Sequence, residues 1–199
     1  MKAERIDCAI VLAAGQSRRM GTQKLLLPLW GKPVIAHVVD ALLESPVHSV
    51  IVVTSRNSAR VRTALAGRAV RFVENPARNA DMLQSVRCGL RTLPANCRAV
   101  LVTPGDLPRL QPGLIQRMLE AFHATPMTIL VPTFRGRHGH PLLFSARFRR
   151  EILTSFDGTG LRGLKRAHPR QVLQWPARTS AILEDLDTPP DYDRMNTIV

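Results

Sequence analysis

A loop rich in glycine, serine and positive charge follows the first apolar run of this 199-residue sequence. The run is AIVLAA, residues 9–14, and the loop then carries Gly15, Ser17, Arg18, Arg19, Gly21 and Lys24. Glycine lets backbone N–H groups close around an anion, and the cations can neutralise phosphate oxygens, arginine as a bidentate fork and lysine as a point charge. The pattern is neither GxxxxGK[ST] nor GxGxxG. The residues alone therefore leave a phosphate-binding loop and a solvated basic loop equally open.

Two aspartates are candidate ligands for a magnesium ion. Asp106 follows a glycine just after the apolar run at residues 99–103, and Asp187 follows a later apolar segment. Magnesium is often held by one or two carboxylates together with substrate phosphates. Each aspartate also has a structural interpretation, Asp106 in a turn or capping a helix after Pro112, and Asp187 capping a final helix. Asp185 competes with Asp187 for the second metal position.

Strand-like and helix-like segments alternate along the chain, and this alternation predicts the framework that positions those side chains. Strands are expected at Cys8–Ala13, Ser49–Thr54, Val70–Val73, Ala99–Thr103 and Met127–Val131, with shorter ones at Pro141–Phe144, Gln171–Gln174 and Ala181–Leu186. Helices are expected at Val34–Glu44, Ser58–Leu65, Met82–Leu93, Gly113–His123, Ala146–Ser155 and Leu161–His168. Such alternation predicts an α/β fold, a three-layer α/β/α sandwich with a mostly parallel sheet and the later strands as an antiparallel flap or edge. No linker or repeat is evident, which predicts one domain over residues 1–199.

Open parallel sheets bind ligands at the carboxyl ends of their strands. Three segments are expected at that edge, namely Gly15–Lys24, Pro104–Pro108 and Leu186–Asp187. The basic loop and the two carboxylates should therefore lie close together.

The chain is strongly basic, with 28 lysines and arginines against 15 acidic residues and a formal net charge of +13. Such a field attracts polyanions, including nucleotides, phosphorylated cofactors and nucleic acid. The arginines are scattered rather than gathered in one stripe, which argues against nucleic acid as a partner. A hydrophobic content of 45% argues against extensive disorder.

Other chemistries and locations have little support in the sequence. His138 and His140 flank Gly139 without the further ligands that zinc requires, and no arrangement typical of covalent catalysis is present. No apolar run reaches the ~18 residues of a membrane span, and the first seven residues are too polar and short for a signal peptide. The three cysteines lack CxxC spacing, as is usual for thiols in a reducing compartment. We therefore expect a cytoplasmic protein with no membrane partner.

The string LAAGQSRRMGTQKLLLP, residues 12–28, resembles the signature LAAGxSxRMGxxKxLLP of nucleotidyltransferases related to the molybdenum cofactor cytidylyltransferases and guanylyltransferases. The matching positions are Leu12, Ala13, Ala14, Gly15, Ser17, Arg19, Met20, Gly21, Lys24, Leu26, Leu27 and Pro28. More distantly, the string is similar to sugar-phosphate and methylerythritol-phosphate nucleotidyltransferases. The resemblance favours the phosphate-binding interpretation of the loop, and it implies a Rossmann-like sandwich of the nucleotide-diphospho-sugar transferase type.

Further segments extend the resemblance along nearly the whole chain, in the same order as in the family. They are GKPV at 31–34, NP at 75–76, SVRCGL at 85–90, GDLP at 105–108, GHP at 139–141 and DLDTP at 185–189. Two departures stand out. Asp81 precedes Met82 where the family commonly has glycine, which bears on base recognition. The stretch DGTGLRG, residues 157–163, differs from a GDxGAR-like segment, which bears on the acceptor.

The resemblance implies transfer of a nucleoside monophosphate from an NTP to a phosphorylated acceptor, with magnesium-dependent release of pyrophosphate. It implies catalytic roles for Arg19, Lys24 and Asp106, and Mg²⁺ binding by Asp106 and Asp187. The implied nucleotide-binding residues are Leu12, Ala13, Ala14, Gly15, Ser17, Arg18, Arg19, Lys24, Asn75, Ser85 and Gly89, and the implied acceptor-binding residues are Gly139, His140 and Pro141. LAAG rather than LAGG indicates CTP over GTP, with molybdopterin as the acceptor and a molybdoenzyme as the recipient of the product.

Two alternatives stay open. A sugar-phosphate or alditol-phosphate nucleotidyltransferase would use the same loop and carboxylates, although the GHP segment and the short C-terminal region speak weakly against it. A non-catalytic nucleotide- or nucleic-acid-binding module would require the positive charge to lie on one face of the protein. This alternative gives Asp106 no function.

Overall fold

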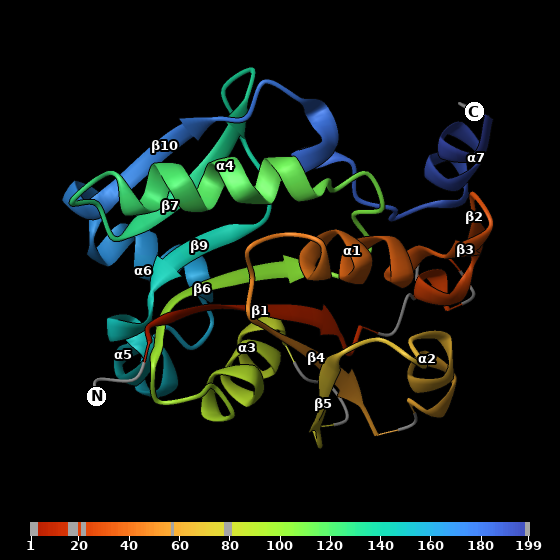
Figure 1. The fold of residues 1–199 in the computed structure, drawn as a ribbon, viewed down its shortest axis with the longest axis horizontal. Coiled ribbons are helices and arrows are strands. Elements are labelled where there is room, and N and C mark those ends of the chain that lie inside the picture. Colours follow the sequence, from red (N-terminus) through yellow and green to blue (C-terminus); the bar gives the residue numbers. More distant parts are fainter. Residues whose placement is uncertain (1–3, 16–19, 21–22, 57, 78–80, 198–199) are drawn as a thin grey trace.

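The centre of the computed structural model, which describes residues 4–15, 20, 23–56, 58–77 and 81–197, is an eight-stranded sheet (Figure 1). The strand order is β10-β7-β9-β6-β1-β4-β5, and β8 pairs with β7. These strands are β1 (Ile6–Ala13), β4 (Ser49–Ser55), β5 (Val70–Asn75), β6 (Cys97–Pro104), β7 (Ile129–Phe134), β8 (Arg137–His138), β9 (Leu142–Ser145) and β10 (Val172–Pro176). β1 pairs in parallel with β4 and β6, as do β4 with β5 and β10 with β7. The mostly parallel sheet is confirmed.

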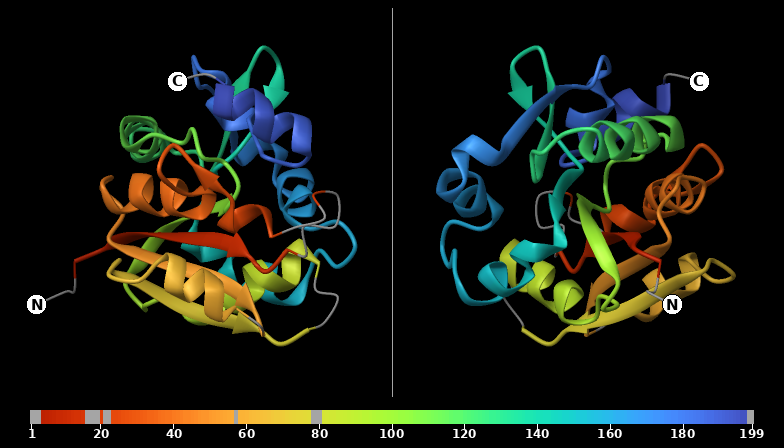
Figure 2. Two further views of the ribbon diagram at one scale, coloured as in Figure 1. Left: turned by 90° about the vertical axis from the view of Figure 1, so that its right-hand side faces the viewer. Right: turned by 60° about the vertical axis from the view of Figure 1, so that its left-hand side comes forward.

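Helices cover both faces of the sheet (Figures 1 and 2). One face carries α1 (Val34–Leu43), α2 (Ala59–Ala64) and α4 (Pro112–His123), and the other carries α3 (Met82–Arg91), α5 (Arg149–Thr154) and α6 (Leu161–Ala167). Alternate side chains of each strand enter opposite cores, so that Val11 packs on the first face and Ile10 on the second. Burial on both faces explains why the strand sequences read as uninterrupted apolar runs. The three-layer sandwich is confirmed.

The antiparallel strand β9 departs from the prediction of a flap or edge. It lies inside the sheet, antiparallel to β6 on one side and to β7 on the other. Its residues Leu142, Leu143 and Phe144 are all buried, because a strand in this position faces a helical layer on each side. The short apolar run at Leu142–Phe144 therefore forms a central strand of the sheet rather than a flap or an edge strand.

The expected strand at Ala181–Leu186 is wrong. The segment overlaps the 3-10 helix η4 (Ser180–Leu183), and Ala181, Ile182 and Leu186 are buried without pairing in the sheet. Its backbone instead joins two strand-end loops, since the Ile182 carbonyl accepts from the His140 N–H at 2.9 Å. The Leu186 N–H donates to the Asp106 carbonyl at 3.0 Å. The segment thus acts as a strap across the edge of the sheet.

A small hairpin and the C-terminal helix complete the region beside the basic loop. The 3-10 helix η1 (Lys24–Leu26) leads into β2 (Pro28–Leu29) and β3 (Lys32–Pro33). Their turn places Trp30 at φ +46° and Gly31 at φ +83°, as a two-residue hairpin turn requires. The Trp30 indole N–H donates to the Met195 carbonyl in α7 (Pro189–Thr197) at 3.2 Å. This contact fastens the hairpin to the C-terminal helix.

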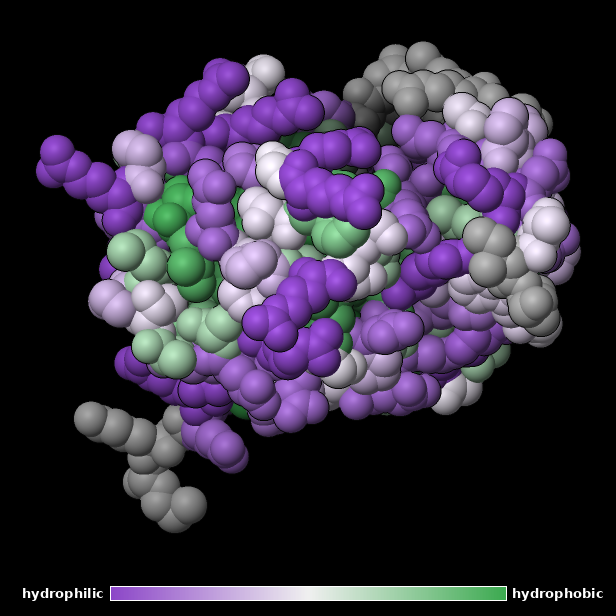
Figure 3. Space-filling model, turned by 90° about the horizontal axis from the view of Figure 1, so that it is seen from above, coloured by the Kyte–Doolittle hydropathy of each residue, from purple (hydrophilic) through white to green (hydrophobic). Residues whose placement is uncertain are grey.

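Hydrophilic side chains dominate the face of the molecule shown in Figure 3, with apolar side chains in small groups between them. Among the described residues, Met82 is the large apolar side chain left exposed, at 55%. None of the helices that the structure describes is long and apolar enough to cross a membrane.

Candidate active site

The loop after β1 begins beside the glycine of the GDLP segment. The Leu12 carbonyl accepts a hydrogen bond from the Gly105 N–H at 3.0 Å, so the ends of β1 and β6 are joined. Ala13 is buried, Ala14 is half-buried and Gly15 is exposed. A Cβ on Gly15 would meet no atom of the described residues within 4 Å, and the backbone there is not left-handed. Because the fold does not require glycine at this position, its small size leaves room for a ligand.

Three residues of the predicted phosphate cradle, Ser17, Arg18 and Arg19, lie outside the described residues. Their implied roles in binding and catalysis stay predictions.

Lys24 joins the two predicted metal ligands. Its Nζ forms an ion pair with the Asp106 carboxylate and donates to Asp187 Oδ1 at 2.7 Å. Lys24 begins η1, Asp106 follows β6 and Asp187 follows η4, so three segments distant in sequence converge here. Burial alone would lower the pKa of Lys24, but the charge of Asp106 and the hydrogen bonds to both carboxylates outweigh it and raise that pKa. Lys24 is therefore a cation throughout the physiological pH range.

Asp187 reaches this cluster by a different route from the one predicted. It does not lie at the end of a strand, because the preceding segment is the strap that contains η4. The hydrogen bond between Leu186 and the Asp106 backbone holds the two aspartates at the same edge. At the start of α7 it is the Thr188 hydroxyl and N–H that donate to the Asp191 carboxylate.

The alternative role of Asp106 as a helix cap is also excluded. Gln111 occupies the N-cap position of α4, without a side-chain hydrogen bond. Asp106 is only 7% exposed, and its Oδ1 has no hydrogen-bond partner among the described residues. An unsatisfied buried carboxylate oxygen is costly, and a bound cation would satisfy it.

The donor set at the cluster fits magnesium. The described residues contain no group of three or more metal-ligating side chains at coordination distance, so two carboxylates would share the ion with ligand phosphates, as magnesium commonly prefers. Asp185 lies close enough to the cluster to interact electrostatically with Asp187, Asp106 and Lys24. Loss of hydration raises its pKa, and the charges of Asp187 and Asp106 raise it further.

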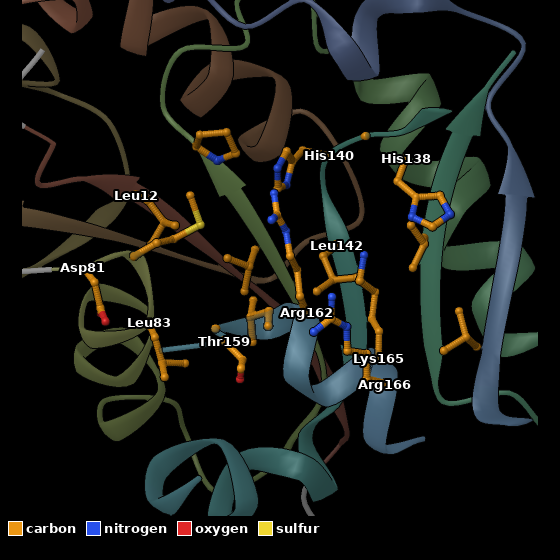
Figure 4. A pocket seen from close by; sticks show the side chains of 18 of the residues that line it. Leu12, Asp81, Leu83, His138, His140, Leu142, Thr159, Arg162, Lys165 and Arg166 are labelled. Atoms are coloured by element: carbon orange, nitrogen blue, oxygen red, sulfur yellow. The ribbon is translucent and has the colours of Figure 1, made fainter. Parts of the chain in front are cut away.

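A cavity of about 900 Å³ opens at the ends of β1 and β6 and continues under α6 (Figure 4). At one end it is lined by Leu12, Asp81 and Met82, and at the other by the loop that carries His138, Gly139 and His140. The side chains of Arg162, Lys165 and Arg166 rise into it from α6. This size lies at the upper end of the range of ligand pockets.

The predicted acceptor loop forms part of this cavity. The His140–Pro141 peptide bond is cis, and the Gly139 N–H donates to the Pro132 carbonyl at 2.9 Å. His140 Nδ1 is buried and has no hydrogen-bond partner among the described residues. Burial lowers the pKa of His140, Asp185 opposes this shift and Lys165 adds to it. His140 is therefore a neutral hydrogen-bonding group at neutral pH.

A family model described as a MobA-like NTP transferase domain matches residues 9–173 of this chain. The chain belongs to the MobA-like NTP transferase family. A nucleotidyl transferase from Methanothermobacter thermautotroptrophicus has a similar structure, with a TM-score of 0.84, 29% identity and coverage of 96% of each chain.

Two curated relatives carry different names. The bifunctional protein GlmU of Kineococcus radiotolerans is 34% identical over 163 residues, which are 78% of this chain and 30% of the relative. A probable molybdenum cofactor guanylyltransferase of Thermococcus sibiricus is 28% identical over 135 residues, 67% of this chain and 65% of the relative. The chain thus spans less than two thirds of the length of either relative.

Within this MobA-like domain, the segment predicted to bind base and ribose is only partly turned toward the cavity. The Asn75 amide donates to the Ser85 hydroxyl at 3.0 Å, and both side chains are buried. A Cβ on Gly89 would come within 2.7 Å of Ile10 Cγ2, so this glycine allows the close packing of α3 on β1. Neither Asn75, Ser85 nor Gly89 is among the residues that line the cavity. Their direct contact with a nucleotide stays a prediction.

Arg87 is a structural residue of the domain that the motif comparison passed over. Its guanidinium donates to the Ile152 carbonyl at 2.9 Å, to the Ser155 carbonyl at 2.8 Å and to Asp157 Oδ1 at 2.7 Å. These bonds tie α3 to α5 and to the chain between α5 and α6. They hold together two walls of the cavity. An arginine within a predicted helix is a candidate for an ion pair with an aspartate. The sequence does not indicate which aspartate, because Asp157 lies 70 positions after Arg87.

His140 should make the stability of the protein pH-dependent. Because its pKa in the folded state is below 6.5, the unfolded chain binds a proton that the folded state excludes as the pH falls below 6.5. We expect the free energy of unfolding to decrease with falling pH in that window, and His140→Gln to make the decrease smaller. Urea unfolding between pH 5 and 8 measures both, with His48→Gln at an exposed position as the control. Parallel profiles for the wild type and His140→Gln would contradict the assignment.

Proposed function

We propose that the protein transfers a nucleoside monophosphate from an NTP, with CTP preferred, to a phosphorylated acceptor, for which molybdopterin is the first candidate. The observation that carries this proposal is the cluster of Lys24, Asp106 and Asp187 where β1 and β6 end, with the open backbone at Gly15 following β1. Membership of the MobA-like NTP transferase family supports it. We also propose that the protein works in the cytoplasm and passes its product to a molybdoenzyme.

The reaction needs charge neutralisation and in-line positioning more than proton transfer. An oxygen of the acceptor phosphate, already ionised at neutral pH, attacks the α-phosphorus, the bond from that phosphorus to the bridging oxygen breaks, and pyrophosphate leaves. Lys24 and the backbone of residues 13–15 would bind and orient the triphosphate. Asp106 and Asp187 would hold Mg²⁺, which supplies positive charge to the phosphates when bound. Neutral His140 would donate a hydrogen bond to the acceptor.

The choice of nucleotide is testable by thermal unfolding with Mg²⁺ and each NTP. A ligand at 100 times its Kd stabilises by about 2.7 kcal/mol, which for a chain of this length raises Tm by about 5–10 °C. We expect CTP to give the largest increase. A larger effect of GTP would instead favour a guanylyltransferase, the activity named for the Thermococcus relative. No protection by any NTP, together with salt-sensitive RNA binding, would contradict the proposal and favour the binding-module alternative.

A further inference from the structure

Arg109 belongs to or contacts all three of the chain segments that form the candidate site. Those segments carry Lys24, Asp106 and Asp187. Arg109 itself lies on the loop between β6 and α4, three positions after Asp106. Its guanidinium contacts Glu184 of the strap and Trp30 in the turn of the β2–β3 hairpin. A single side chain thus joins three segments that are distant from one another in sequence.

The contact between Arg109 and the strap is an ion pair. Arg109 Nε lies 3.1 Å from Glu184 Oε2, and Glu184 precedes Asp187 by three positions. The same loop and strap are also joined by the hydrogen bond from the Leu186 N–H to the Asp106 carbonyl at 3.0 Å. One link therefore lies next to the two carboxylates, and the other lies a few residues away from them. Two links at different points oppose a rotation of the strap about the loop that one link would allow.

The contact between Arg109 and the hairpin is a cation–π interaction. The Arg109 guanidinium lies over the Trp30 ring, 5.5 Å from its centroid, which is within the range of an attractive contact. The Trp30 indole is itself held by its hydrogen bond to the Met195 carbonyl. Lys24 lies six positions before Trp30, and η1 and β2 connect the two residues. Arg109 therefore also links the segment that carries Lys24 to the loop that carries Asp106.

The loop that carries Asp106 and Arg109 is well held, so a contact at Arg109 can fix the position of Asp106. Leu107 and Leu110 are buried, and the Leu110 N–H donates to the Leu107 carbonyl at 3.1 Å in a turn that contains Arg109. At the other side of Asp106, the Gly105 N–H donates to the Leu12 carbonyl. The carboxylate of Asp106 therefore lies on a short segment whose two ends are both held by the core.

We infer that Arg109 is a positioning residue for the candidate site, and that its ion pair with Glu184 sets the separation of the Asp106 and Asp187 carboxylates. This inference rests on the proposed function. Magnesium demands near-ideal octahedral geometry, so a small shift of either carboxylate weakens its binding. The ion pair is 28% exposed at each side chain, and pairs of such exposure contribute little to stability. Loss of the pair should therefore affect the metal site more than the fold.

Titration with Mn²⁺, followed by electron paramagnetic resonance, tests the inference without catalytic turnover, and loss of binding in Asp106→Asn identifies the site. We expect Arg109→Met to raise the Kd for Mn²⁺ about tenfold, the lower end of the effect of residues that orient metal ligands. The direction is informative, because removal of a positive charge would by itself strengthen the binding of a cation. Glu184→Gln should also raise the Kd. The double variant should bind no more weakly than the weaker of the two single variants, because both break the same ion pair.

The matched control is Arg68→Met, which removes the same charge and breaks a partly buried ion pair with Asp40 outside the three segments. It should lower Tm at least as much as Arg109→Met and leave the Kd for Mn²⁺ unchanged. A wild-type Kd in folded Arg109→Met and Glu184→Gln, or an equal loss in Arg68→Met, would overturn the inference. A wild-type protein that transfers no nucleotide but binds Mn²⁺ in an Arg109-dependent way would contradict the proposed reaction and support the positioning role. The two claims therefore fail by different measurements.

Discussion

Asp106→Asn should reduce the rate of pyrophosphate release by about 10³-fold, because stabilisation by a bound metal ion is worth several kcal/mol. Asparagine keeps the volume of the side chain and removes its charge. The backbone carbonyl of residue 106 still accepts from Leu186, and Lys24 keeps its contact with Asp187. The variant should therefore fold, with a change in Tm of no more than about 4 °C.

The matched control for this loss is Asp193→Asn. Asp193 is an exposed carboxylate on α7, and among the described contacts its backbone carbonyl, not its side chain, accepts from Thr197. The control should keep full activity. Steady-state pyrophosphate release measures both variants, and circular dichroism verifies their folding. Normal turnover by a folded Asp106→Asn protein would remove Asp106 from the metal site.

Gly139→Ala should have the largest effect on stability. A Cβ at this position would overlap the Ile182 carbonyl oxygen and lie 2.8 Å from Ile182 Cβ. That same carbonyl accepts from the His140 N–H, so the acceptor loop and the strap would have to move apart. We expect the free energy of unfolding to fall by about 3 kcal/mol and Tm to fall by about 6–12 °C.

Gly15→Ala provides the comparison, since a Cβ there meets none of the residues that the structure describes within 4 Å. It should leave Tm almost unchanged and weaken NTP binding. Scanning calorimetry of the two variants separates the roles of the two glycines. Equal stability of Gly139→Ala and the wild type would mean that the strap is not held against the acceptor loop.

The alternation of apolar runs was enough to predict the layers and most elements of the fold. The central strands are buried on both faces, so the local pattern and the tertiary position agree. The antiparallel strand β9 was predicted, but its position at a flap or edge and the strand expected at Ala181–Leu186 were wrong, because a short apolar run indicates burial without indicating its partner. Leu142–Phe144 and Ala181–Leu186 look similar in sequence, yet only the former finds neighbouring strands on both sides.

The sequence predicted which residues form the candidate site but not which contacts they make with one another. Motifs identified Lys24, Asp106 and Asp187, but not that Lys24 bridges the two carboxylates. The conformation of the strap brings Asp187 into place, and that conformation depends on contacts more than 40 positions away along the chain. Of the α6 cations, Arg162 lies in the stretch DGTGLRG that the sequence linked to the acceptor. Lys165 and Arg166 carried no such signal, since they are two among 28 basic residues and only the fold places them on the same cavity.

The proposed reaction transfers the nucleoside monophosphate of the NTP, which contains the α-phosphorus, to an acceptor. The most direct test incubates the protein with Mg²⁺, molybdopterin and CTP labelled at either the α- or the γ-phosphate. We expect the α-label to join the acceptor and the γ-label to leave as pyrophosphate. Transfer of the γ-label to the acceptor, or its release as inorganic phosphate, would contradict the proposed reaction.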